Sequence, residues 1–298
     1  MTILVTGATG FVGERVCNML LKINKKIRII SRSRSPKYED LIVTDLASEN
    51  ISRSIFKGVS DVIHMAGYAH DVRSRDKEEE YIKINYEATK ELAKIASQSG
   101  VSNFIFLSST KAGNDDNIDT SAEEAEGIYG MSKRAAEIAI LEIASKSSMR
   151  VNIIRPALIY GPNVKGNLSS MIKGIKQGWF PPLPNTNNKR SMVHVDDVSK
   201  SILFLMENKS VNMQIYNVTD NIDYSSSEIY DTLREALGKR KRKLRFPYIV
   251  FKVLSFLHPS IKYRVDKLLG NETFSCSKIL SLGFRPERTL KQINETNY

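Results

Sequence analysis

Pairs of tyrosine and lysine four positions apart are the first residues in this sequence whose types and spacing could carry out chemistry. On a helix this spacing places both side chains on one face, where the lysine cation can stabilise a tyrosinate acting as a general acid or base. The chain holds four such pairs: Tyr86/Lys90, Tyr129/Lys133, Tyr248/Lys252 and Tyr263/Lys267. Twelve tyrosines and 26 lysines in 298 residues give about one such pair by chance, so the spacing alone does not identify a site.

A glycine-rich segment near the start of the chain is the second chemical signal. An apolar run at 2–6 leads into the sequence Gly-Ala-Thr-Gly-Phe-Val-Gly and then into a helical pattern. Gly7 permits a tight turn, Gly10 lets the backbone approach a pyrophosphate at the helix N-terminus, and Gly13 allows the helix to pack closely on the strand. In this context the segment predicts a dinucleotide site. Its expected cofactor-binding residues are Gly7, Gly10, Phe11, Val12 and Gly13.

Short apolar strands alternate with longer helical patterns through the first 155 residues. Strands are expected at 2–6, 27–31, 41–44, 60–65, 102–108 and 150–155, and helices at 11–23, 78–99 and 127–146. This alternation is typical of an α/β fold with a doubly wound parallel sheet. We therefore expect a dinucleotide-binding Rossmann domain over residues 1–157.

The pattern changes after Arg155-Pro156, where glycine and proline punctuate shorter segments. A smaller substrate lobe is expected over residues 158–298, and a strand near 214–218 is a candidate to rejoin the main sheet. Helices are expected at 168–177, 196–207 and 226–237. The last of these begins in the sequence Ser225-Ser226-Ser227-Glu228, where a serine and the glutamate fit an N-cap arrangement.

The expected fold selects one of the four Tyr–Lys pairs. A hydride-transferring enzyme on this fold needs its acid/base near the carboxyl ends of the strands. Only Tyr129/Lys133 meets this condition, because it follows the strand at 102–108 by about twenty residues and opens the next helix. Ser109, at the end of that strand, is the expected hydroxyl donor to the same substrate oxygen, and Thr110 is the alternative. The predicted catalytic residues are Tyr129, Lys133 and Ser109.

The spacing of two residues between successive glycines resembles the extended branch of the short-chain dehydrogenase/reductase superfamily, and the likeness covers nearly the whole chain. It implies that Lys133 and the nicotinamide lower the pKa of Tyr129, which exchanges a proton with a substrate hydroxyl while the nicotinamide exchanges a hydride. It also implies that Asp45 and Leu46 contact the adenine and that Ala66 and Gly67 line the cofactor site. By the same resemblance, Asn85 braces the active-site helix.

The residues after the second strand bear on the choice between NAD and NADP. An NAD enzyme usually carries an acidic residue there to bind the ribose 2'-hydroxyl, but this chain has Ser31 followed by Arg32. A guanidinium binds a 2'-phosphate through charge and paired donors. The sequence therefore favours NADP slightly over NAD, with solvated loop arginines as the alternative interpretation.

The second lobe carries a segment, 190–197, that looks like the R-x-h-h-H-V-D-D segment of nucleotide-sugar epimerases and reductases. By this resemblance Arg190 grips the substrate diphosphate, Asn167 lies near the nucleotide, and His194 is structural. The expected substrate site comprises Ser109, Thr110, Tyr129, Asn167 and Arg190. One departure is Leu158, where 4-epimerases commonly carry an asparagine.

The chain as a whole resembles UDP-glucose 4-epimerase-like extended short-chain dehydrogenases, especially the UDP-N-acetylhexosamine 4-epimerases and UDP-N-acetylquinovosamine 4-reductases of surface-polysaccharide clusters. The resemblance implies an oxidoreductase or epimerase acting at C4 of a UDP-sugar in O-antigen-type biosynthesis. The alternatives are a short-chain reductase of a non-sugar carbonyl substrate and a non-catalytic NADP-binding sensor. A 4,6-dehydratase is not expected, because Lys111 follows Thr110 where such enzymes usually carry Asp-Glu.

Composition and charge limit the cellular setting. The start of the chain lacks a secretory pattern, its two cysteines have no metal-ligand spacing, and no apolar run reaches the length of a membrane helix, so a cytoplasmic protein without a metal site is expected. The net charge of +11 includes a dense basic run at 239–245. A solvated loop is the first interpretation of this run, followed by weak membrane-surface association through 239–257. Nucleic-acid binding is not expected, and a homodimer is left open.

Overall fold

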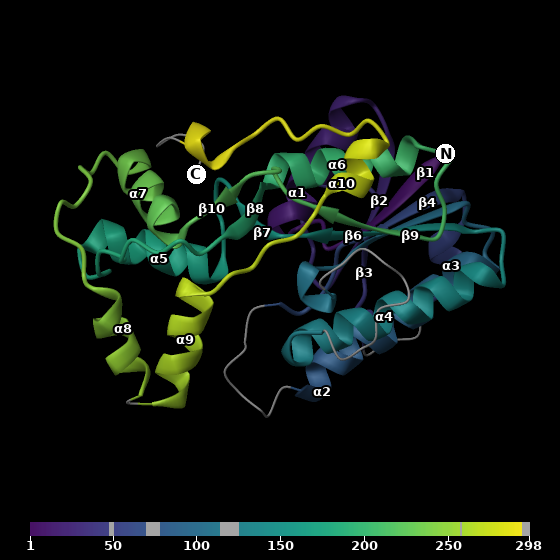
Figure 1. Ribbon diagram of the computed structural model, residues 1–298. Helices are drawn as coiled ribbons and strands as arrows, with labels where there is room; N and C mark the ends of the chain where they lie inside the picture. Colours follow the sequence, from purple (N-terminus) through teal and green to yellow (C-terminus); the bar gives the residue numbers. More distant parts are fainter. Residues whose placement is uncertain (48–50, 70–77, 114–124, 257, 294–298) are drawn as a thin grey trace. The chain divides into compact units, whose positions relative to one another are not determined.

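A seven-stranded parallel sheet in the order β3-β2-β1-β4-β5-β6-β9 forms the centre of the computed structural model (Figure 1). The structure describes residues 1–47, 51–69, 78–113, 125–256 and 258–293. The strands of this sheet are β1 (Thr2–Thr6), β2 (Lys26–Ser31), β3 (Leu41–Val43), β4 (Val59–His64), β5 (Asn103–Leu107), β6 (Arg150–Pro156) and β9 (Gln214–Val218). The doubly wound α/β fold expected from the sequence is confirmed.

Helices cover both faces of this sheet (Figure 1). Helices α1 (Phe11–Lys22) and α6 (Val195–Glu207) pack together on one face, and α3 (Ala88–Gln98) and α4 (Gly127–Ser145) pack together on the other. The helix expected at 78–99 is divided into α2 (Glu78–Tyr81), a π-helical segment η3 (Ile82–Glu87) and α3. A π-helical turn inserts an extra residue, which changes the direction of the side chains on that segment and is frequent at functional sites.

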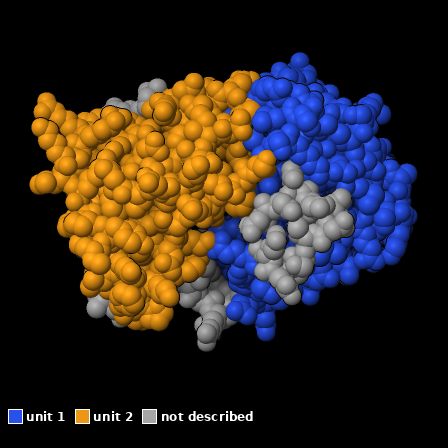
Figure 2. All heavy atoms as spheres, viewed as in Figure 1, with its two compact units in different colours: residues 1–157, 195–218, 276–285 blue, residues 158–194, 219–275, 286–298 orange. Residues whose placement is uncertain are grey.

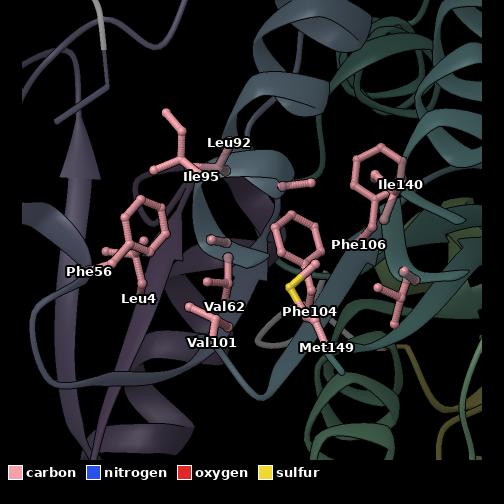
Figure 3. Packing of buried hydrophobic residues seen from close by; sticks show 14 of the residues in the cluster. Leu4, Phe56, Val62, Leu92, Ile95, Val101, Phe104, Phe106, Ile140 and Met149 are labelled. Atoms are coloured by element: carbon pink, nitrogen blue, oxygen red, sulfur yellow. The ribbon is translucent and has the colours of Figure 1, made fainter. Parts of the chain in front are cut away.

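The core of the sheet is apolar on both faces, as expected for parallel strands buried between helices. Figure 3 shows Leu4, Val62, Phe104 and Phe106 of the strands packing with Leu92, Ile95 and Ile140 of the helices, and all seven side chains are buried. This packing fixes the strands whose carboxyl ends carry the expected site.

The chain divides into two compact units (Figure 2). Unit 1 comprises Met1–Ala157, Val195–Val218 and Cys276–Arg285, and unit 2 comprises the rest. The sequence placed helix 196–207 in the second lobe, whereas α6 packs against α1 in unit 1, and Phe204 of α6 contacts Phe284 at a centroid distance of 5.6 Å. These contacts return two later segments of the chain to the first unit.

Unit 2 has a three-stranded sheet of its own and a separate apolar core. Its elements are β7 (Leu158–Tyr160), β8 (Arg190–His194), β10 (Asp223–Tyr224), α5 (Gly166–Gln177), α7 (Ser226–Ala236), α8 (Tyr248–Ser255) and α9 (Pro259–Leu269). The expected cap of α7 is confirmed: the Ser225 hydroxyl accepts from the Glu228 amide at 3.1 Å, and the Glu228 carboxylate accepts from the Ser225 amide at 2.7 Å. Within the described ranges, no helix is long and apolar enough to cross a membrane.

A buried carboxylate joins α4 to β6. Arg155 of β6 donates from Nε to Glu137 Oε1 at 2.8 Å and from a terminal nitrogen to Oε2, and Arg134 donates to Oε2 at 3.3 Å. The side chains of Glu137 and Arg155 are fully buried. Two guanidinium groups therefore share one carboxylate inside the protein and tie the helix to the sheet at one register.

We expect Glu137→Gln to lower the free energy of unfolding by about 3 to 5 kcal/mol, because it removes the buried carboxylate that the Arg134 and Arg155 guanidinium groups share. Glu142→Gln on the same helix is the matched control, since the Glu142–Lys146 pair is exposed and should hardly affect stability. Urea unfolding of the three proteins measures the difference. Equal losses in both variants would show that the buried triad does not hold α4.

Candidate active site

The glycine-rich loop between β1 and α1 has the geometry of a dinucleotide cradle. Gly7 adopts a left-handed conformation with φ of 72°, and its carbonyl accepts the Gly10 amide at 2.9 Å, which closes the turn. A Cβ atom at Gly13 would lie only 2.0 Å from the Gly7 carbonyl oxygen, so the close approach of loop and helix needs a glycine there. The free amides at the start of α1 are left available to an anion. The loop thus fits the pyrophosphate of a nicotinamide dinucleotide.

The other expected cofactor residues lie at the carboxyl ends of the neighbouring strands. Asp45 follows β3 and accepts the Ala47 amide at 3.1 Å, and the adjacent Leu46 packs against the unit 1 core. Ala66 follows β4, and its amide donates to the Thr6 hydroxyl at 3.1 Å, which ties it to the end of β1. The parallel order of the strands brings these segments to one edge of the sheet.

Arg32 follows β2 at the same edge. Its side chain is exposed, and among the described residues it forms no ion pair. Arg34, two positions on, is also exposed. Arg32 is thus exposed at the end of β2, its contact with a cofactor phosphate stays a prediction, and Arg34 offers a neighbour for comparison.

Tyr129 lies in the first turn of α4, close to the loop that follows β5. The Glu126 amide donates to the Lys111 carbonyl at 2.8 Å, and a Cβ atom at Gly130 would lie 2.1 Å from that oxygen. A glycine at 130 is therefore needed for this close approach. Burial raises the pKa of Tyr129 to about 12, an effect opposed by the Ser109 hydroxyl and reinforced by Tyr81. In the chain alone Tyr129 is thus a protonated phenol at neutral pH.

The hydroxyls of Ser109 and Thr110 face different partners. The Ser109 side chain interacts with Tyr129 and accepts the Lys111 amide at 3.3 Å, capping a short 3-10 helix, η4 (Thr110–Ala112). The Thr110 hydroxyl is buried and donates to the Pro156 carbonyl at 3.3 Å. Of the two candidates, the geometry brings Ser109 to the tyrosine.

Lys133 lies one turn after Tyr129 and is buried against the end of β5. Its ammonium group donates to the Leu107 carbonyl at 3.0 Å and lies 4.6 Å from the centre of the Phe106 ring. Burial lowers the pKa of Lys133 to about 8, and Glu137, one turn further along α4, opposes this effect. A group with this pKa is mostly protonated at pH 7, so the site holds a positive charge beside Tyr129.

Asn85 connects the loop after β4 to α4. Its amide nitrogen donates to the Tyr68 carbonyl at 3.0 Å and to the Ser132 hydroxyl at 3.1 Å, while its carbonyl oxygen accepts the Tyr68 amide at 2.7 Å. A Cβ atom at Gly67 would lie 3.1 Å from both Asn85 Oδ1 and Lys133 Nζ. Asn85, Gly67 and Lys133 are therefore brought together, and the π-helical segment η3 places Asn85 among them.

Tyr81 packs next to Tyr129, a contact that was not anticipated from the sequence. Tyr81 is buried and lies edge-on to both Tyr68 and Tyr129, with centroid distances of 4.8 and 6.2 Å. Edge-to-face pairs of this kind restrain the rings that form them. The sequence offered no signal for Tyr81 beyond its aromatic side chain.

His64, at the end of β4, was also missed. Its ring nitrogens lie 2.6 Å from the Thr6 hydroxyl and 2.8 Å from the Thr89 hydroxyl, and its ring stacks on Phe106. Burial, together with the nearby Lys133 cation, lowers the pKa of His64 to about 3. The available signal was a polar residue closing an apolar strand, two positions before Ala66.

The remaining expected substrate residues belong to unit 2. Asn167 is exposed in the first turn of α5. Arg190 of β8 is largely buried and donates to the Lys267 carbonyl and to the Glu272 carboxylate. His194 is buried and lies edge-on to Tyr160 at 5.3 Å. The diphosphate contact assigned to Arg190 remains a prediction, because this guanidinium already holds a carboxylate.

A Rossmann unit with a Tyr–Lys pair on the helix after the fifth strand defines the short-chain dehydrogenase/reductase class. Residues 3–219 match the model of the NAD dependent epimerase/dehydratase family. The chain is 33% identical to a UDP-glucose 4-epimerase of Vibrio cholerae, over 98% of this chain and 92% of the relative. The chain therefore belongs to the NAD dependent epimerase/dehydratase family, as the resemblance in the sequence indicated.

A further relative agrees with this family, and a solved structure agrees with the fold. An N-acetyl-alpha-D-glucosaminyl-diphospho-ditrans,octacis-undecaprenol 4-epimerase of Escherichia coli O157:H7 is 25% identical, over 97% of this chain and 92% of the relative. The solved structure of UDP-N-acetylglucosamine 4-epimerase from Bacillus cereus superposes with a TM-score of 0.78 at 21% identity, covering 98% of this chain and 96% of that one. At this identity the structural likeness shows the fold alone.

The buried His64 makes a testable contribution to the pH dependence of stability. Its pKa of about 3 in the folded chain lies below the ordinary value of 6.5, so between these values the unfolded chain binds more protons and wild-type stability falls as the pH is lowered. We expect the stability difference between wild type and His64→Gln to shrink by about 2 kcal/mol from pH 7.5 to pH 5. Urea unfolding across this pH range measures the free energy of unfolding of both proteins. A difference between them that does not change with pH would contradict a neutral buried His64.

Proposed function

We propose that this protein catalyses NAD(P)-dependent oxidoreduction at C4 of a UDP-sugar, either as a 4-epimerase or as a 4-keto reductase. The observation that carries the proposal is the half-buried Tyr129 and the buried Lys133, one turn apart on α4 beside the loop of Ser109. The UDP-glucose 4-epimerase among the relatives supports a UDP-sugar substrate. A UDP-N-acetylhexosamine type of sugar and a place in surface-polysaccharide biosynthesis are the finer parts of the proposal, carried by the resemblance of the sequence.

The chemistry divides between the cofactor and the chain. When bound, the nicotinamide supplies the carbon that accepts or returns a hydride at the sugar C4. Tyr129 exchanges the proton of the C4 hydroxyl, and Lys133 supplies the positive charge that makes the phenolate accessible despite burial. Ser109 donates a hydrogen bond to the same sugar oxygen, with Thr110 as the alternative donor. Asn85 keeps α4 and the loop after β4 in register while this proton moves.

Recognition of the nucleotide part is assigned to unit 2. We infer that Arg190 binds the diphosphate and that Asn167 lies near the nucleotide. The Glu272 carboxylate competes with a diphosphate for the Arg190 guanidinium, so binding requires Arg190 to change partners. The desolvation free energy of the guanidinium adds little to the cost of binding in such an exchange, because the arginine is charge-paired both before and after it.

The cofactor is a nicotinamide dinucleotide, and the family description names NAD. Within this class we infer a preference for NADP, because Ser31 removes the repulsion that an acidic residue would impose on a 2'-phosphate and the exposed Arg32 can pair with it. An epimerase retains its nicotinamide through oxidation and re-reduction, whereas a reductase releases it. A preference for NADPH would therefore favour the 4-keto reductase.

A lipid-linked sugar diphosphate is the second candidate substrate. The relative from Escherichia coli O157:H7 carries an undecaprenol-linked sugar in its name. In this chain, exposed apolar side chains gather in residues 244–263 of unit 2, which favours contact with a lipid. The chemistry at the sugar C4 would be the same in both cases.

The proposal is tested by incubating the protein with UDP-N-acetylglucosamine, UDP-N-acetylgalactosamine or a UDP-4-keto-6-deoxy sugar, with NADH, NADPH or no added cofactor, and following the products by NMR. Interconversion of the first two sugars without added cofactor identifies an epimerase, and reduction of the keto sugar identifies a reductase. A 4-keto-6-deoxy product formed from a UDP-hexose would instead indicate a dehydratase. Cofactor binding without turnover of any of these sugars would favour a non-sugar carbonyl substrate or a sensor.

We expect Tyr129→Phe to reduce turnover by about 10²- to 10⁴-fold while cofactor affinity is retained, because it removes only a proton-transfer group. Lys133→Met should weaken cofactor binding as well. Tyr86→Phe is the matched control, since Tyr86 also has a lysine four positions later and Lys90 lies 5.7 Å from its ring. A larger loss of turnover in Tyr86→Phe than in Tyr129→Phe would place the site elsewhere.

We expect the chain to bind NADPH about ten- to a hundredfold more tightly than NADH, and Arg32→Ala to remove most of this difference, since it deletes a charge-assisted hydrogen bond to the 2'-phosphate. Arg34→Ala, in the same exposed loop, is the control. Fluorescence titration with both reduced cofactors measures the ratio. Tightly held NAD in the purified protein, with no loss of discrimination in Arg32→Ala, would show that Arg32 is a solvated loop residue.

A further inference from the structure

The positive charge of this chain is concentrated in one segment of unit 2. Residues 239–267, here termed the basic hairpin, contain ten lysine or arginine residues and one acidic residue, Asp266, a net of +9. The rest of the chain contains 34 basic and 32 acidic residues, a net of +2. The overall charge of +11 is therefore a property of this segment rather than of the protein surface in general.

The basic hairpin is also the main apolar surface of the described chain. Eight of the seventeen exposed large apolar side chains among the described residues lie in it: Leu244, Phe246, Tyr248, Ile249, Val253, Leu254, Phe256 and Tyr263. Leu244 is 87% exposed and Phe256 is 78% exposed. Soluble proteins rarely expose a run of apolar side chains of this kind unless it meets a partner.

The hairpin is built so that one side holds it to unit 2 and the other remains exposed. Helices α8 and α9 contact each other and form a helical hairpin (Figure 1). Phe251 of α8 is buried in the unit 2 core, whereas Ile249, Val253 and Phe256, at spacings of four and three, share an exposed face. Leu257, which closes the apolar stretch singled out in the sequence, lies outside the described residues.

The basic run leading into α8 is anchored at both ends. The Lys239 ammonium donates to the Ile175 and Lys176 carbonyls at 2.9 and 2.7 Å, and Arg245 pairs with Asp231. Between these anchors, Arg242 and Lys243 are exposed. Within the described ranges, seven cationic side chains of the hairpin form no ion pair: Lys239, Arg240, Arg242, Lys243, Lys252, Lys262 and Arg264.

We propose that the basic hairpin is a docking surface for an anionic lipid bilayer, on which α8 lies in the interface with its exposed apolar face among the acyl chains. Apolar side chains flanked by lysine and arginine on a short helix are the combination that binds such interfaces. Cations without ion partners complement the negative surface of the bilayer, and each contributes to attraction within a Debye length. The surface is peripheral, since no helix in the described part of the chain is long enough to span a membrane.

Charge and apolar surface together favour an anionic bilayer over a second copy of the chain or a nucleic acid at the basic hairpin. A second copy of the chain would bring another net charge of +9 against the first, which opposes a symmetric contact at this face. A nucleic acid would match the charge, but it offers no acyl chains to the aliphatic side chains of Leu244, Ile249, Val253 and Leu254. An anionic bilayer satisfies both the charge and the apolar surface.

Vesicle flotation of the full chain tests the proposal. The probes are vesicles of phosphatidylcholine alone and of phosphatidylcholine mixed equally with phosphatidylglycerol. We expect binding to the anionic vesicles only, weakened when NaCl is raised from about 0.1 to about 1 M. Arg242→Gln with Lys243→Gln should weaken binding about twenty-five-fold, at about fivefold per cation, and Leu244→Ser with Phe256→Ser should weaken it at least about tenfold.

The control variants carry the same changes on unit 1. Lys25→Gln with Lys26→Gln removes two exposed cations, and Leu21→Ser with Ile23→Ser removes two exposed apolar side chains. These controls should bind vesicles like wild type. Thermal unfolding of every variant and its turnover of a water-soluble UDP-sugar are measured in parallel, so that a failure of the proposed function leaves the vesicle result interpretable.

Three outcomes would overturn the proposal. The first is wild-type protein that ignores anionic vesicles, or hairpin variants that bind them as wild type does. The second is tighter binding to an oligonucleotide than to anionic vesicles at equal salt, which would assign the surface to nucleic acid. The third is a wild-type dimer that Leu244→Ser with Phe256→Ser converts to a monomer in light scattering, which would assign it to a second copy.

Discussion

The carboxylate of Glu137, buried between the guanidinium groups of Arg155 and Arg134, is the interaction on which the geometry of the site depends. Tyr129, Lys133 and Glu137 follow one another at intervals of four residues, so they share one face of α4. When Arg155 fixes Glu137 to β6, it also fixes where the two preceding turns of the helix lie on the sheet. A buried ion pair of this kind adds little net stability compared with apolar packing, but it permits only one register of helix on strand.

Burial sets the protonation states of Tyr129, Lys133 and His64 in this part of the protein. It raises the pKa of Tyr129 to about 12 and lowers those of Lys133 and His64 to about 8 and about 3. At neutral pH the site therefore holds a neutral phenol, a neutral imidazole and one ammonium group. A second cation beside Lys133 would be costly in this low-dielectric setting, so a neutral His64 leaves Lys133 as the cation of this group.

The sheet could be predicted because it depends on local patterns, and the choice of Tyr129, which rests on the same patterns, stays a prediction. Parallel strands buried on both faces appear as continuous apolar runs, and the glycine spacing and strand order then restrict Tyr129 to one edge. The partnership of Glu137 with Arg155 could not be predicted, since the two residues lie 18 positions apart and meet only when α4 packs on β6. The π-helical segment η3 was missed because one inserted residue leaves the helical periodicity of 78–99 almost unchanged. The return of α6 to unit 1 depends on packing against α1, which no local signal encodes.

The proposed function assigns the chemistry at the sugar to unit 1 and the recognition of the group that carries the sugar to unit 2. In the proposed function, proton exchange at a sugar C4 hydroxyl involves Tyr129, Lys133 and Ser109 of unit 1, and this chemistry does not depend on what is attached to the sugar diphosphate. The same proposal assigns the choice between a nucleoside and a lipid carrier to unit 2, which holds Arg190 and the basic hairpin. A soluble nucleotide sugar needs only a few cations at its diphosphate, whereas a net charge of +9 beside exposed aliphatic side chains exceeds that need. This excess is what a surface carrying both anionic headgroups and acyl chains would require.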